Sequence, residues 1–323
     1  MVTVKQDTTL DTTLPYSPSG RRMEEQCWVT PKIAADLLGL SLSHDFTKEG
    51  RRPQIRLVDT SKANQAIYTV FGLQDDPDES TVCMGTQAYN RWQALGFPDT
   101  GIVVEMGVSV TTGTVKFAEQ LTTATGTYLA ILAPHGGEIE KYIDDQVQFF
   151  DTDPAAASLK QMGVQCWYCT GTGSPAWNRW HITADDTSEL SFPLLATMIS
   201  TPPRFTYAVA FHGQQKTEEV LIGGMASLEL KQAIKDAIAP LLDPAILDGP
   251  ATTKTGADFI RLATATDELG ALRHENIVNR IAQQGGIQLE QGEKIRQHWA
   301  PEIAGAVASV FQQYAGSLRS RLD

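Results

Sequence analysis

Long apolar runs are missing from this chain of 323 residues, and so is the short apolar core of an export signal. No stretch approaches the roughly 20 apolar residues that a membrane-spanning helix needs. Residues 1–9 are polar and rich in threonine, which argues against a secretory signal peptide. We therefore expect a cytoplasmic protein that has no membrane partner.

Positive charge is also scarce, because the chain has 26 Lys and Arg residues and 38 Asp and Glu residues, which gives a net charge of −12. Phosphate binding depends on a basic face, so the composition argues against nucleic acid as a partner. A few arginines could still form a small local pocket for an anion. The apolar fraction of 42% and the charged fraction of 20% are typical of a globular protein with a substantial core.

Cysteines number only four, and without an export signal we expect them to be free thiols. The segment Cys166-Trp-Tyr-Cys169 has the spacing of a redox or metal-binding pair. A second such pair, which a structural zinc site would need, is missing. The segment is equally typical of an aromatic strand, and this favours two small buried residues over a redox site.

Composition divides the chain into three parts. Residues 1–22, rich in Thr, Pro and Ser, predict a disordered leader. Residues 23–118 alternate short strands with two short helices that each end in Leu-Gly, and they predict a small β-rich accessory domain. The two helices faintly echo each other, as the halves of a double-psi barrel do, although coincidence explains the echo equally well. Residues 119–323 alternate strands and helices, which predicts an α/β domain.

Within residues 119–323 the apolar pattern predicts strands and helices with these bounds. The strands are expected at 127–133, 163–169, 206–211, 219–223, 258–264 and 286–290. The helices are expected near 138–148, 189–200, 227–239, 274–284, 290–298 and 302–318.

Two of the predicted strands deliver a histidine at their ends. Residues 128–133 form an apolar run that breaks at Pro134, and His135 follows with two glycines and, five residues on, Glu140. A second apolar run, 205–211, ends at His212. Strand ends hold side chains rigidly while the adjoining loops leave them open to substrate. Two histidines and a carboxylate are the three protein ligands of many catalytic zinc sites.

A zinc hydrolase also needs a base for its water, and Glu290 at the end of an apolar strand can serve. Partners that fix the imidazoles could come from Asp144, Asp145, Asp185 or Asp186, and the residues alone do not choose among them. Each candidate has a structural alternative. The histidines could be ordinary core residues, and Glu138, Glu140 and Glu290 could favour a helix dipole. His181 could be a third ligand or only a hydrogen-bonding strand residue.

Five blocks of sequence carry a resemblance to a known family. They are Ala-Pro-His135-Gly-Gly-Glu-Ile-Glu140, Trp180-His181-Ile-Thr183, Phe211-His212-Gly213, Asn276-Ile-Val-Asn279-Arg280 and Gly286-Ile-Gln-Leu-Glu290 with Arg296 beyond it. Together, and in this order, they resemble the poly-γ-glutamate hydrolase family of phage enzymes and bacterial relatives. The resemblance covers roughly residues 125–300. It implies a mixed twisted sheet with helices on both faces, similar to the zinc carboxypeptidases.

The resemblance also implies functional roles. Zn²⁺ would be bound by His135, Glu140 and His212, and Glu290 would be the catalytic base. The substrate would be an acidic γ-glutamyl polymer, whose carboxylates Asn279, Arg280 and Arg296 would contact, since a guanidinium forms a two-pronged pair with a carboxylate. Structural salt bridges explain the two arginines equally well. A phage-type enzyme could leave the cell at lysis.

The chain departs from the family pattern at two places near the proposed metal. Glu138 stands where the family often has a small neutral residue, and Lys141 where it tends to have Pro or Gly. The first 120 residues are not explained by the family. Two alternatives therefore stay open, namely a zinc amidohydrolase or carboxypeptidase-like enzyme acting on N-acyl amino acids or peptides, and a non-catalytic scaffold or binding protein.

Overall fold

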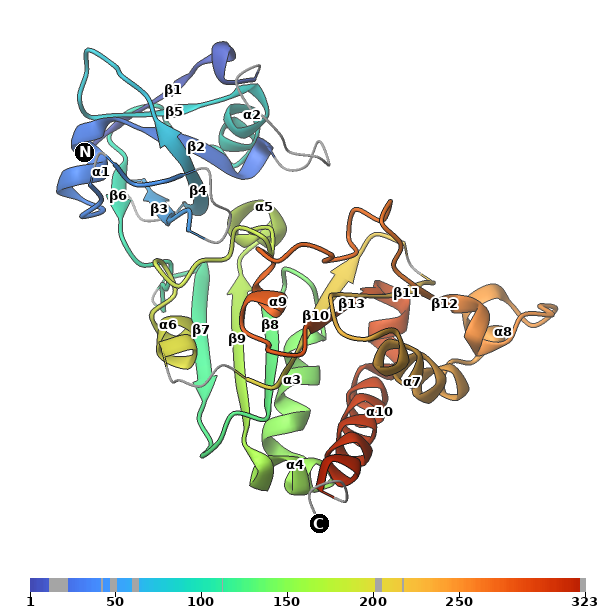
Figure 1. The fold of residues 1–323 in the computed structure, drawn as a ribbon. Coiled ribbons are helices and arrows are strands. Elements are labelled where there is room, and N and C mark those ends of the chain that lie inside the picture. Colours follow the sequence, from blue (N-terminus) through green and yellow to red (C-terminus); the bar gives the residue numbers. More distant parts are fainter. Residues whose placement is uncertain are drawn as a thin grey trace. The chain divides into compact units, whose positions relative to one another are not determined.

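A computed structural model describes residues 1–11, 23–41, 43–46, 51–59, 64–111, 113–200, 205–216 and 218–319 (Figure 1). Its contacts divide the chain into two units. The first is Met1–Ala118 with Gly171–Ala196, and the second is Glu119–Thr170 with Thr197–Asp323. The segment Gly171–Ala196 therefore groups with the first unit, whereas the sequence pattern assigned it to the α/β domain.

The first unit is built on a six-stranded sheet with the order β1-β5-β2-β4-β3-β6. An antiparallel bridge between Val2 and Ile102 links the two outer strands and closes the sheet into a ring. The bounds of its strands are β1 (Thr3–Gln6), β2 (Gln26–Val29), β3 (Gln54–Val58), β4 (Gln65–Leu73), β5 (Thr81–Met84) and β6 (Val103–Glu105).

Strand pairing shows that this ring is an internal repeat. Strand β2 leads into α1 (Pro31–Asp36), and β5 leads into α2 (Thr86–Ala94). β1 runs parallel to β5, just as β4 runs parallel to β2. β3 pairs antiparallel with β4, and the Val2–Ile102 bridge likewise pairs the ends of β6 and β1 antiparallel. Each half is thus strand, strand, helix, strand, so the structure favours a repeat over coincidence as the origin of the faint sequence echo.

The start of the chain differs from the prediction of a disordered leader. Residues 3–6 form β1, and the 3-10 helix η1 (Thr8–Asp11) follows it. The prediction is wrong here because Val2 and Val4 are buried on alternate positions, a two-residue period that the surrounding threonines concealed. The rest of the predicted leader, residues 12–22, lies outside the described residues.

The second unit contains a seven-stranded sheet with the order β12-β11-β13-β10-β8-β9-β7. β10 runs parallel to both β8 and β13, while β11 runs antiparallel to β13, so the sheet is mixed and the predicted α/β class is confirmed. The strands are β7 (Lys116–Thr122), β8 (Leu129–Gly137), β9 (Val164–Thr172), β10 (Tyr207–Gln214), β11 (Val220–Gly223), β12 (Ile260–Leu262) and β13 (Gly286–Gly292).

Helices cover both faces of this sheet. α3 (Ile143–Thr152) and α10 (Glu293–Arg319) contact each other and pack on one face, where Leu129, Phe211 and Leu289 lie in the core. α9 (Ile277–Arg280) packs against β10 and β13. Burial on both faces explains why the central strands are continuous apolar runs. The remaining helical segments are η2 (Met23–Glu25), η3 (Pro154–Ala156), α4 (Ala157–Met162), α5 (Ala176–Trp180), α6 (Pro193–Ser200), α7 (Leu228–Ile238), η4 (Ala239–Leu241), α8 (Pro244–Asp248) and η5 (Gly256–Phe259).

The C-terminal segment α10 consists of two helices that meet at a kink, as the sequence predicted. Trp299 has non-helical backbone angles there, two residues before Pro301. Proline lacks the N–H that an uninterrupted helix would use, which accounts for the break. The expected helix start at residue 290 is wrong, because residues 286–292 belong to β13.

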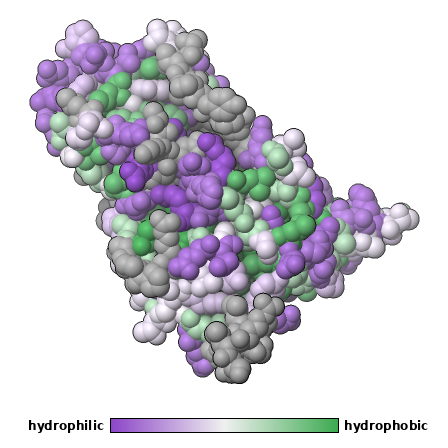
Figure 2. Space-filling view, viewed as in Figure 1, coloured by the Kyte–Doolittle hydropathy of each residue, from purple (hydrophilic) through white to green (hydrophobic). Residues whose placement is uncertain are grey.

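No helix in the described ranges combines the length and the hydrophobicity that crossing a membrane would require. Figure 2 shows hydrophilic and hydrophobic residues interspersed on the face that it draws. That face carries many polar residues, as the acidic composition leads one to expect.

The four cysteines are free and buried. Cys166 and Cys169 lie three positions apart on β9, so their side chains point to opposite faces of the sheet and cannot act as a pair. Burial raises the pKa of the Cys166 thiol to about 12 and that of Cys83 to about 11. The structural interpretation of the Cys-Trp-Tyr-Cys segment is therefore favoured over a redox role.

We expect all four thiols to resist a thiol-specific reagent at pH 8 while the protein is folded, and all four to react in denaturant, because the thiolate is the reactive form. Their folded pKa values lie above the unfolded value of about 8.5. Their contribution to the free energy of unfolding is thus complete below about pH 8.5 and is lost progressively as the pH rises from there toward 11 or 12. Rapid labelling of one thiol in the native protein would contradict this burial.

Candidate metal centre

His135 comes from the end of β8, which is longer than the sequence predicted. The strand continues through Pro134 to Gly137, although a break at the proline was expected. Its ladder with β10 spans residues 129–132, so Pro134 lies beyond the positions where that ladder would need its N–H. The strand therefore holds His135 rigidly, with only 2% of its surface exposed.

The two glycines after His135 are required by the backbone. A Cβ on Gly136 would lie 2.5 Å from the carbonyl oxygen of Cys169 and 2.6 Å from the Cβ of Asp144. Gly137 has a φ of 71°, in the left-handed region that favours glycine. The turn then closes through a hydrogen bond from the Glu140 N–H to the His135 carbonyl, at 2.8 Å. This turn brings the Glu140 side chain back toward the strand end.

Glu140 lies in this turn rather than in the following helix, because α3 begins only at Ile143. A helix-dipole role for Glu140 is thus excluded by its position, and the carboxylate is buried at 4% exposure. A buried carboxylate needs partners that compensate for its lost hydration.

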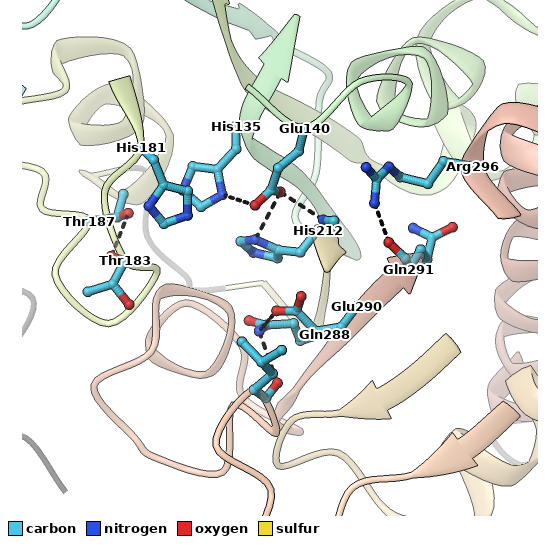
Figure 3. Close-up of polar contacts among 12 residues, drawn as sticks. His135, Glu140, His181, Thr183, Thr187, His212, Gln288, Glu290, Gln291 and Arg296 are labelled. Carbon is cyan, nitrogen blue, oxygen red and sulfur yellow. Dashed lines mark hydrogen bonds and ion pairs between the residues drawn. The ribbon is translucent and has the colours of Figure 1, made fainter. Parts of the chain in front are cut away.

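The three predicted ligands converge in the second unit (Figure 3). Oε1 of Glu140 lies 3.2 Å from Nδ1 of His135, and Oε2 lies 3.7 Å from Nδ1 of His212. The two imidazole rings are 5.0 Å apart between centroids and inclined at 67°. His212 comes from β10, the neighbour of β8 in the sheet. Adjacent parallel strands thus bring both histidines to one edge.

This donor set fits a zinc ion. Zinc in proteins is held by imidazole nitrogens and carboxylate oxygens at about 2.0–2.1 Å, so ligand atoms on a tetrahedron lie about 3.3 Å apart. The separations of 3.2 Å and 3.7 Å between nitrogen and oxygen are close to that edge. Each imidazole therefore lies at about the ligand spacing from one oxygen of the shared carboxylate.

Gly213 joins the metal-site residues to Arg296. Its N–H donates to Oε2 of Glu140 at 2.8 Å. A Cβ on this residue would lie 2.4 Å from Nη1 and 2.6 Å from Cζ of Arg296, so only glycine lets the guanidinium pack here. Arg296 donates from Nε to the Lys141 carbonyl at 2.9 Å and from Nη1 to the Gln291 carbonyl. Burial lowers the pKa of Arg296, and the carboxylates of Glu140 and Glu290 oppose that shift.

We expect Gly213→Ala to reduce both stability and activity. The added methyl must displace a buried guanidinium that is held by two backbone carbonyls, and overpacking of this kind costs about 1–3 kcal/mol. Denaturant unfolding and turnover would measure the two effects. Gly305→Ala in α10 is the matched control, because its Cβ would meet the ring of Phe149 at an ordinary 3.4 Å. Equal behaviour of the two variants would contradict the packing argument.

Glu290 lies on β13 directly beside His212, since the two residues are Cα partners in the parallel ladder of β10 and β13. Its side chain is 3% exposed. Nε2 of Gln288 donates to Oε1 of Glu290 at 2.7 Å. Glu293, not Glu290, occupies the first turn of α10, so the helix-dipole explanation fails for Glu290 as well. The structure thus places the predicted base next to the predicted ligands.

Asn279 does not support the predicted substrate contact. Its Oδ1 accepts from the N–H groups of Met225 and Gly286, at 3.0 and 3.1 Å. Its Nδ2 donates to the carbonyls of Ala271 and Arg273, both at 2.7 Å. Because an amide side chain has two donor and two acceptor positions, all four are used within the protein, and Asn279 holds these loops together. The sequence pattern could not distinguish this role from substrate binding.

The two arginines predicted beside Asn279 differ from each other. Arg280 is the last residue of α9 and is partly exposed. Arg296 is 6% exposed and donates two hydrogen bonds to backbone carbonyls. A structural role therefore accounts for Arg296, whereas the exposure of Arg280 is compatible with a ligand contact.

His181 belongs to the first unit, at the C-terminal end of α5 rather than in a strand. Its ring stacks on Trp177 with 3.9 Å between centroids, and its Nδ1 lies 2.5 Å from Oε1 of Glu25. Oε2 of Glu25 also accepts from the Thr183 N–H at 2.9 Å. This carboxylate fixes the ring orientation of His181, a contact that no sequence signal predicted.

One of the four aspartates considered as partners of the imidazoles has another role. Asp186 forms a buried ion pair with Arg52 within the first unit, at 2.8 Å. Asp144 packs against Gly136 of the metal-site turn. The carboxylate that lies beside both candidate histidines is Glu140 itself.

The chain is similar to proteins of one family. A family model described as poly-gamma-glutamate hydrolase matches residues 110–305. No curated protein matches the chain. Among solved structures, a bacteriophage poly-gamma-glutamate hydrolase is similar with 21% identity and a TM-score of 0.47, over 64% of this chain and 93% of that one.

Two further solved structures share less. YNDL in an apo, zinc-free form has 15% identity and a TM-score of 0.45, over 61% of this chain and 90% of that one. A putative metallopeptidase from Shewanella baltica OS155 has 11% identity and a TM-score of 0.38, over 62% of this chain and 81% of that one.

Proposed function

The chain belongs to the poly-gamma-glutamate hydrolase family, and we propose that it cleaves an acidic γ-glutamyl polymer with one zinc ion held by His135, Glu140 and His212. It is a hydrolase of γ-glutamyl amide bonds, as the family match over residues 110–305 shows. The observation that carries the metal proposal is the convergence of two buried imidazoles on the two oxygens of one buried carboxylate.

The proposed chemistry needs a base beside the ligands. When bound, zinc would polarise the amide carbonyl and lower the pKa of a water toward neutrality. The carboxylate of Glu290, next to His212 in the sheet, would accept a proton from the water while the oxygen of that water attacks the amide carbon. It would then deliver that proton to the leaving nitrogen, so that the products are a carboxylic acid and an amine.

Arginine side chains would recognise the substrate. Each γ-linked glutamate carries one free carboxylate, which suits a guanidinium donor. We assign this contact to Arg280, because it is partly exposed at the end of α9. Arg296 would add positive charge beside Glu140 while holding the Lys141 and Gln291 carbonyls. The exposed Glu138 and Lys141 in the turn would influence which chain length fits.

The test is hydrolysis of purified poly-γ-glutamate followed on a gel, with and without a chelator. We expect chain shortening that stops on chelation and returns when zinc is added, because the ligands are side chains that survive metal removal. N-acyl amino acids and α-linked peptides serve as the comparison panel. Release of small acids from that panel, with the polymer left intact, would assign the site to the alternative substrate class. Hydrolysis that resists every chelator would remove the zinc proposal.

A further inference from the structure

The side chain of Gln288 contacts the proposed base, Glu290. It lies two residues before Glu290 on β13, so both side chains point to the same face of the sheet. Both are buried, at 4% and 3% exposure. Nε2 of Gln288 donates to Oε1 of Glu290 at 2.7 Å (Figure 3). The amide thus holds one oxygen of the proposed base.

The orientation of this amide is fixed by a chain of hydrogen bonds that starts at the backbone. The N–H of Val278 donates to Oδ1 of Asn276 at 3.1 Å, which makes Asn276 the N-cap of α9. The Nδ2 of Asn276 therefore faces Gln288 and donates to its Oε1 at 3.2 Å. With Oε1 committed, Nε2 of Gln288 faces Glu290 and also donates to the Leu269 carbonyl at 3.3 Å. A main-chain N–H can only donate, so the donor and the acceptor of every hydrogen bond in this series are fixed.

This direction matters for a carboxylate that must accept a proton. A donor at Oε1 attracts the carboxylate and restricts its rotation, whereas an oxygen in the same place would repel it. We propose that Gln288 is the positioning residue of Glu290, and that Asn276 sets the polarity of Gln288. This inference rests on the proposed function, because it takes Glu290 to be the base.

Gln288→Met tests the inference with a side chain of similar length and no amide. We expect kcat to fall about 10- to 100-fold, with KM for poly-γ-glutamate and bound zinc unchanged, because Gln288 is buried and contacts the base. The same substitution is then made in a Glu290→Asp background, where the shorter carboxylate no longer reaches the Gln288 amide. There, Gln288→Met should lower kcat by less than about two-fold, because the effects of two residues that act as a unit are not additive. An equal loss in both backgrounds, or wild-type kcat in folded Gln288→Met, would overturn the inference.

Asn276→Asp is the second variant, and it separates positioning from folding. Aspartate caps a helix as well as asparagine does, so α9 keeps its cap. Circular dichroism establishes that the variant is folded, because the new carboxylate is buried. The new carboxylate cannot donate to Gln288, so the Gln288 amide turns over and presents its oxygen to Glu290. We expect kcat to fall about as far as in Gln288→Met. Unchanged kcat in this variant would show that the polarity of the chain is irrelevant and would overturn the inference.

The control is Gln284→Leu, an exposed glutamine in the loop just before β13, which should keep full activity. Glu290→Gln distinguishes an error in the base assignment from an error in the positioning role of Gln288. If Glu290→Gln hydrolyses the polymer at the wild-type rate, the proposed base is wrong and the inference falls with it. If Glu290→Gln is inactive while Gln288→Met is fully active, only the positioning role of Gln288 is wrong.

Discussion

Glu290→Gln should retain zinc and lose most hydrolysis, with kcat reduced about 10²- to 10⁴-fold. The amide has nearly the same shape as the carboxylate and still lies beside His212, but it cannot accept a proton from water. Because Glu290 is not among the three proposed ligands, the metal should remain. Turnover on poly-γ-glutamate together with metal analysis of the purified variant measures both halves of this expectation.

The matched control is Glu302→Gln on the exposed side of α10, which removes the same charge from a residue outside the proposed ligand, base and substrate contacts and should leave kcat unchanged. Because the Gln288 amide donates to Oε1 of Glu290, the variant side chain can still accept that bond through its own carbonyl oxygen. The fold around β13 should therefore persist, and a loss of activity would report chemistry. Full activity of Glu290→Gln would remove the base assignment.

His135→Ala should lose both zinc and activity. The change removes one of three proposed ligands, and a zinc held by two protein groups is bound far more weakly than one held by three. Metal analysis should fall from about one ion per chain toward zero, and hydrolysis should fall at least as far as in the Glu290 variant. His212→Ala should behave in the same way, because Glu140 contacts both rings.

His274→Ala controls for the loss of a histidine as such, since His274 is exposed and lies outside the ligand set. It should retain the wild-type metal content and rate. Thermal unfolding with and without zinc adds a second measurement, because a ligand that binds only the folded state raises the midpoint. We expect zinc to stabilise the wild type and the His274 variant and to leave the His135 variant unchanged. Stabilisation of the His135 variant by zinc would place the metal elsewhere.

Local pattern was enough to predict much of the second unit. The apolar runs identified β8, β9, β10 and β13 to within a few residues, because strands that are buried on both faces must be apolar throughout. The paired glycines after His135 marked a turn whose backbone tolerates little else. The pattern failed where a local signal had two meanings. Pro134 suggested a strand end although it lies beyond the ladder with β10. Pro301 was the opposite case, because a new helix was expected there and α10 is kinked at Trp299.

The role of individual polar residues was less predictable. Asn279 lies in the same family block as Arg280, yet its side chain is used entirely by four backbone groups. Gln288 gave no signal except its position two residues before Glu290 on a strand. Whether an amide serves a substrate, a loop or a catalytic base depends on which partners the fold places within about 3 Å of it, and those partners come from distant parts of the sequence.

The sequence by itself determined the local elements, the charge that argues against nucleic acid, and the two strands that end in histidine, because these depend on residue type and on spacing along the chain. Tertiary structure alone decided that β10 lies between β8 and β13. That order places His135 and His212 against Glu140 and aligns His212 with Glu290. Strand order is set by long-range burial of both sheet faces, a property of the assembled core that no single segment contains.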